Sequence, residues 1–82
     1  RGASGTPYRI AVGHRHGARP ANIVAALTAA GRVDGSAIGR IDIRDTHSLV
    51  EIMGDLDAPT RRRMALARIV GRPTRLERDQ GH

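Results

Sequence analysis

The chain has 82 residues, no cysteine, and 14 basic residues, all of them arginine, which give a formal net charge of +6. This length limits the protein to one small domain with a thin core, and the lack of cysteine excludes disulfide bonds and thiolate metal sites. No apolar run approaches the roughly 20 residues that a membrane-spanning helix needs, so we expect a cytoplasmic protein with no membrane partner.

The first third of the chain predicts a strand and then a helix. Residues 1–7 are mostly small, and we expect them to form a flexible linker end. Apolar and polar side chains alternate over 8–12, which predicts a half-buried strand with Tyr8 on its inner side. A loop over 13–19 leads to an apolar-rich helix over 20–31, which begins with proline and stops at glycine.

The middle of the chain predicts a hairpin. The stretch IGRIDIRDTHSLVEI, residues 38–52, reads as two short strands that turn at RDTH. We expect its inner face to hold Ile41, Ile43, Ser48, Val50 and Ile52. The outer face is a mixture of arginine, acid, histidine and leucine side chains.

The last third predicts a second helix and a final strand. Asp57 can cap the helix and Pro59 suits its first turn. The helix is expected to continue until Gly71 ends it. Residues 72–78 then predict a strand at the edge of the sheet, because they contain a proline. We expect residues 79–82 to form a flexible tail.

The order strand, helix, strand, strand, helix, strand predicts an α+β fold. With two right-handed crossovers, β-α-β-β-α-β forms a four-stranded antiparallel sheet with both helices on one face, the ferredoxin-like arrangement. The other face of such a sheet is open to solvent or to a ligand.

Three segments of the chain together resemble one protein family. They are VGHRHGARPANIVAAL at 12–27, IGRIDIRDTHSLVEI at 38–52, and the short basic strand after the second helix. These segments are similar to the RNA-binding domain of bacterial DEAD-box RNA helicases of the DbpA and CsdA (DeaD) type. The resemblance covers residues 8–78 and implies an RRM-like fold, a divergent RNA-recognition motif.

The resemblance also implies a non-catalytic module whose partner is structured RNA. In the family, this domain tethers an ATP-dependent helicase core to RNA, including ribosomal RNA, and the resemblance links it to ribosome biogenesis, cold shock and RNA degradation. The sequence contains no phosphate-binding loop and no DEAD acid cluster. Any ATPase would therefore lie in the remaining helicase domains of the parent chain.

The chain departs from an RNA-recognition motif in its aromatic residues. Such a motif stacks bases on exposed aromatics of its central strands. Here the corresponding positions hold Arg9, His47 and Leu49, and the one aromatic residue, Tyr8, faces inward. Since stacking contributes roughly 1–3 kcal/mol per base, we expect weak binding of single strands, and recognition of structured RNA mainly through arginine–phosphate and shape contacts.

The charges divide the chain into two basic regions around an acidic one. Residues 1–40 hold six arginines and one acid, residues 41–60 one arginine and five acids, and residues 61–82 seven arginines and two acids. Arginine pairs with phosphate through a planar fork and can stack on bases. The candidate RNA-binding residues are Arg9, Arg15, His16, Arg19, Arg40, His47, Arg72 and Arg75. We expect Arg9, Arg40 and His47 to lie side by side as a shelf on the open sheet face. The sequence leaves open which of three surfaces dominates binding: this sheet face, the loop over 13–19 or the last strand.

Each candidate has a simpler interpretation that the sequence leaves open. Arg15 and Arg19 could belong to a solvated loop, and Arg9 and Arg40 could pair with acids across the strands. The whole open sheet face, where Leu49 stands among charges, could instead serve protein interaction or dimerisation. Otherwise we expect the isolated domain to be monomeric.

No set of residues predicts catalysis, a cofactor or a metal site. There is no cysteine nucleophile, and Ser48 is expected to face the core. His14 and His16 form an H-x-H pair, but no nearby cysteine or acid completes a metal site. The five acids between 42 and 57 lack the spacing of a calcium loop.

Overall fold

The computed structural model describes residues 5–54 and 56–79. These residues form β1 (Thr6–Ile10), η1 (His14–His16), α1 (Pro20–Gly31), η2 (Gly35–Ala37), β2 (Ile38–Ile43), β3 (Ser48–Ile52), α2 (Ala58–Leu66), β4 (Arg68–Ile69), β5 (Arg72–Pro73) and β6 (Glu77–Arg78). The expected linker end and tail lie mostly outside the described residues. Strand β1 begins at Thr6, two residues earlier than predicted.

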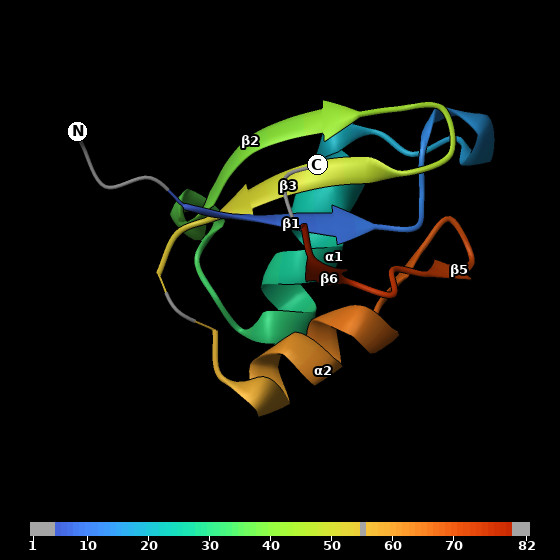
Figure 1. Cartoon of the computed structure of the whole chain (residues 1–82). Helices are drawn as coiled ribbons and strands as arrows, with labels where there is room; N and C mark the ends of the chain where they lie inside the picture. The colour runs from blue at the N-terminus through green and yellow to red at the C-terminus, as the bar shows by residue number, and fades with distance from the viewer. Residues whose placement is uncertain (1–4, 55, 80–82) are drawn as a thin grey trace.

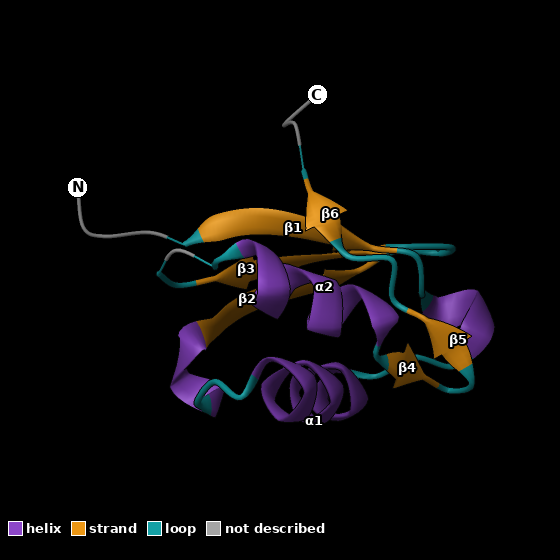
Figure 2. Ribbon diagram, turned by 90° about the horizontal axis from the view of Figure 1, so that it is seen from below, coloured by secondary structure: helices purple, strands orange, loops and turns teal. Residues whose placement is uncertain are grey.

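Strands β2, β3, β1 and β6 form an antiparallel sheet in that order, and β4 pairs with β5 in a separate hairpin. Helices α1 and α2 both lie on one side of the sheet, and no helix covers the opposite face in the described part of the chain (Figures 1 and 2). The predicted α+β, ferredoxin-like and RRM-like arrangement is confirmed.

The core lies between the sheet and the two helices. Burial alternates along β1 as the sequence pattern predicts, so Tyr8 and Ile10 are buried while Arg9 is exposed. Ser48 is fully buried, and its hydroxyl donates a 2.6 Å hydrogen bond to the Val12 carbonyl oxygen. The fully buried apolar side chains are Ile10, Val12, Ile23, Leu27, Val50, Ile52 and Met64. Each contributes about 1.5–3 kcal/mol by leaving water.

A bulge in β2 sets which residues reach the core. Ile38 pairs with Ile52 and Ile41 with Val50, so β2 uses one more residue than β3 over the same span. The extra residue allows Ile38 to be buried while Ile41 still packs against the core. The Glu51 carboxylate accepts the backbone N–H of Arg40 at 3.5 Å beside the bulge.

Helix α1 spans residues 20–31, as predicted. Gly31 is the last helical residue, and Arg32 takes the left-handed conformation, with a φ of 57°. Gly31 is needed for another reason: a Cβ at this position would collide with the side chain of Met64, which is fully buried under α1. The absence of a side chain therefore lets the two helices approach closely.

The predicted extension of the second helix to Gly71 is wrong, because α2 ends at Leu66. The last carbonyls of a helix need partners, and residues beyond the helix supply them. The Thr74 hydroxyl donates to the Met64 carbonyl at 2.5 Å, and the Arg75 N–H donates to the Ala65 carbonyl at 3.0 Å. The chain then forms the β4–β5 hairpin, which turns at Val70.

The single final strand predicted over 72–78 is also wrong. Strands β5 and β6 are separated by a segment in which Thr74 and Leu76 are both buried. This alternating burial alone would suit a strand, so the interruption comes from the backbone and not from the burial pattern. Arg75, between them, has a φ of 50°, and this left-handed turn directs its side chain outward.

Candidate nucleic-acid interface

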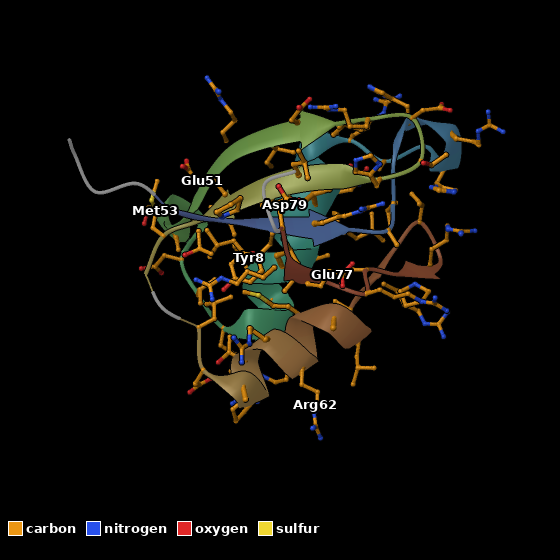
Figure 3. All side chains as sticks on the ribbon, viewed as in Figure 1. Tyr8, Glu51, Met53, Arg62, Glu77 and Asp79 are labelled. Carbon is orange, nitrogen blue, oxygen red and sulfur yellow. The ribbon has the colours of Figure 1, made fainter. Side chains whose placement is uncertain are left out.

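The open face of the sheet carries a row of mixed side chains. Leu49 in β3 pairs with Arg9 in β1 and with Asp42 in β2, and Arg9 also pairs with Glu77 in β6. Glu51 and Glu77 can be located on β3 and β6 in Figure 3. No aromatic side chain stands in this row. It therefore offers a base little stacking surface.

Arg40 lies apart from the other predicted sheet residues. It lines a shallow hollow of about 300 Å³ together with Pro7, Asp42, Leu49, Val50 and Glu51. Arg9 and His47 line a different hollow. The expected shelf of Arg9, Arg40 and His47 is thus divided by Leu49, and two carboxylates accompany Arg40.

The acid beside Arg40 is held by another arginine. The Arg44 guanidinium forms an ion pair with Asp42 at 2.7 Å. This hydrogen bond lowers the pKa of Asp42, and the same contact raises the pKa of Arg44. Among the described residues, the ion pairs are Arg44–Asp42 and Arg15–Asp45, so the cross-strand pairs considered for Arg9 and Arg40 do not form.

The loop before α1 is docked on the turn between β2 and β3. The N–H groups of His14 and Arg15 donate to the carbonyls of Arg44 and Asp45, each at 2.8 Å. A Cβ on Gly13 would lie 2.5 Å from the Arg44 oxygen, so only glycine permits this approach.

The three predicted residues of this loop have different surroundings. Arg15 forms an ion pair with Asp45 at 3.3 Å, with both side chains 69% exposed. The His16 Nδ1 accepts the Gly13 N–H at 3.0 Å, which closes the loop and gives this histidine a structural contact. Arg19 is exposed at the N-cap of α1, and its side chain makes no capping hydrogen bond.

A second hollow brings several predicted residues together. It measures about 310 Å³ and is lined by Arg9, Ala11, Thr46, His47, Arg75 and Glu77. A neighbouring hollow of about 300 Å³ is lined by Ala11, Gly71, Arg72, Pro73 and Arg75. Because the two hollows share Ala11 and Arg75, we treat them as one surface and call it the edge groove.

The edge groove lies at the end of the molecule where both the β2–β3 turn and the β4–β5 hairpin are found (Figure 1). Within residues 5–54 and 56–79, the guanidinium groups of Arg9, Arg72 and Arg75 make no hydrogen bond or ion pair, in contrast to Arg15 and Arg44.

Two groove residues with polar side chains, Thr46 and Glu77, were not among the predicted site residues. Thr46 belongs to a turn and Glu77 to a two-residue strand, and no local sequence pattern joins them. The arginines of α2 lie elsewhere. Arg63 donates to the Ala30 carbonyl at 3.1 Å, and Arg62 points away from α2 into solvent (Figure 3).

Comparison with known proteins identifies the family. The family model described as "DbpA RNA binding domain" matches residues 7–78. The chain belongs to the DbpA RNA-binding domain family. The predicted resemblance is confirmed, and RNA binding is the function of this DbpA-family domain.

Two curated relatives are the ATP-dependent RNA helicases DeaD of Mycobacterium tuberculosis strains CDC 1551 and H37Rv. Each is 41% identical to this chain over 66 residues, which cover 80% of the chain. The chain spans only 12% of the length of these helicases. The DbpA-family domain is thus the RNA-binding module, and the helicase ATPase core is not among its 82 residues.

Two further observations concern other kinds of site. In the part of the chain that the structure describes, no three His, Asp or Glu side chains gather closely enough to hold a metal ion. None of the described helices combines the length and the apolar character needed to cross a membrane.

Proposed function

We propose that this DbpA-family domain tethers an ATP-dependent RNA helicase to structured RNA, such as ribosomal RNA or a structured messenger RNA, mainly through arginine–phosphate contacts. The absence of aromatic side chains from the open sheet face, where Arg9 pairs with Leu49, carries the proposal. Without stacking, the affinity has to come from the backbone. A paired helix presents phosphates more densely than a single strand, so it favours this mode.

A titration of binding against salt tests this proposal. The 82-residue chain is mixed with a labelled RNA stem-loop and, separately, with an unpaired RNA of the same length, between 50 and 200 mM salt. We expect the stem-loop to bind more tightly, with a log–log slope of roughly −0.9 for each phosphate neutralised. No binding at 50 mM salt, or tighter binding of the unpaired RNA, would refute the proposal.

The open sheet face offers little support for a dimerisation module. Leu49 is half-buried and flanked by Arg9 and Asp42, so the apolar area is small compared with a stable interface, which buries about 1,200–2,000 Å². We expect a monomer in analytical ultracentrifugation. A dimer that Leu49→Glu dissociates would favour the interaction module instead.

A further inference from the structure

We propose that the edge groove is where this domain binds the ribose–phosphate backbone of RNA: Arg9, Arg72 and Arg75 contact successive phosphates, and Glu77 accepts a ribose 2′-hydroxyl. This inference rests on the proposed function and assigns it to one surface of the three that the sequence left open. It names the chemical groups that the surface recognises.

The electrostatics favour the edge groove over the other two surfaces. The hollow on the sheet face contains Arg40 beside Glu51, which repels phosphate, and beside Asp42, which is already paired with Arg44. In the loop before α1, Arg15 is already paired with Asp45. The edge groove combines three arginines with a single carboxylate, so it has the highest excess of positive charge among the three.

The geometry of the edge groove also suits an extended backbone. Arg75 lines both hollows, with Arg9 on one side and Arg72 on the other. A series of guanidinium groups along two joined hollows matches a chain with a repeating negative charge better than it matches one compact anion. Guanidinium forks bind phosphate oxygens in pairs, which fixes the direction of the backbone as well as its position.

The backbone at Arg75 supports a functional role. A φ of 50° is uncommon for a residue other than glycine, and such strain persists where the surrounding structure or function requires it. Here Thr74 and Leu76 are anchored in the core on both sides. The strained residue is thereby held so that its guanidinium projects into the groove.

Glu77 is the one carboxylate of the groove, and its backbone lies opposite that of Arg9 in the β1–β6 ladder. A carboxylate accepts hydrogen bonds and repels phosphate, so its favourable partner on a nucleic acid is a donor. The ribose 2′-hydroxyl is such a donor, and DNA lacks it. Glu77 therefore makes the groove selective for RNA over DNA.

Charge-matched variants test the assignment. Arg9→Gln, Arg72→Gln and Arg75→Gln are compared with Arg40→Gln on the sheet face and Arg62→Gln on α2, and circular dichroism confirms that each variant is folded. With the same RNA stem-loop, we expect each groove variant to bind about five- to tenfold more weakly. The magnitude of its log–log slope of affinity against salt concentration should fall by about 1. The two controls should stay within twofold.

Glu77→Ala adds a second readout with a stem-loop RNA and a DNA of the same sequence. We expect the preference for RNA to fall severalfold. If the variant gains affinity equally for RNA and DNA, the removal of a negative charge explains the effect, and the proposed role of Glu77 is overturned. If the unsubstituted 82-residue chain binds RNA while the groove variants bind as tightly as the controls, the groove assignment fails and the proposed function stands. If the unsubstituted 82-residue chain binds no RNA, both fail.

Discussion

Thr74 connects three parts of the fold through its hydroxyl and backbone, and we expect Thr74→Val to destabilise the domain strongly. The residue is fully buried. Its hydroxyl donates to the Met64 carbonyl at 2.5 Å and accepts the Leu76 N–H at 3.2 Å. Its backbone carbonyl accepts the Ala11 N–H at 2.7 Å, which attaches this segment to the end of β1.

Valine keeps the shape of threonine but cannot form the two hydroxyl bonds. The Leu76 N–H then loses its partner, and a buried donor without a partner costs about 1–3 kcal/mol. The Met64 carbonyl retains the Ala67 N–H at 3.2 Å, so its loss is one ordinary hydrogen bond of about 0.5–1.5 kcal/mol. Together these losses lower the free energy of unfolding by about 2–4 kcal/mol.

Urea denaturation followed by far-ultraviolet circular dichroism measures the free energy of unfolding of each variant. In a thermal melt of a domain of this size, the expected loss lowers the melting temperature by roughly 10–25 °C. Thr74→Ser is the matched control, because it keeps the hydroxyl and removes one methyl group, at a cost of about 1 kcal/mol. A valine variant within 0.5 kcal/mol of the parent, or a serine variant weaker than the valine variant, contradicts the reasoning.

Three other substitutions test separate features. Gly13→Ala should cost about 2–4 kcal/mol, because its Cβ meets backbone oxygens, while Gly35→Ala, with nothing within 4 Å, should be nearly neutral in the same urea assay. Val70→Asn should raise stability by up to about 1 kcal/mol, because Val70 has a φ of 47° in an exposed turn that asparagine tolerates; Val70→Thr should show no gain. Hydrogen bonds from Thr60 lower the pKa of Asp57, so its capping contribution is present above pH 4 and is lost as the pH falls through the folded pKa. Urea midpoints between pH 6 and 2 should therefore fall less steeply for Asp57→Asn, and parallel pH profiles would contradict this origin.

The features that depend on near neighbours in the chain could be predicted from the sequence. The two-residue period of a strand placed Tyr8 and Ser48 on the inner face, and both are buried. Asp57 caps α2 by accepting the Thr60 N–H at 3.0 Å, as its position before the helix predicts. The order of strands and helices was sufficient to predict the α+β topology, because few chain paths allow short, right-handed crossover connections.

The features that depend on partners distant in the chain could not be predicted from the sequence. Helix α2 ends at Leu66 because Thr74 and Arg75 bond to its last carbonyls, and local helix propensity contains no information about those bonds. The prediction grouped Arg9 with Arg40, but the fold places Arg9 beside Arg75, which is 66 positions away in the chain. A groove is a property of which segments meet in space. The arginines that we propose to bind RNA can be named from the sequence. Their meeting on one surface depends on the tertiary structure, in which the Ala11 N–H donates to the Thr74 carbonyl and attaches the segment after β5 to the end of β1.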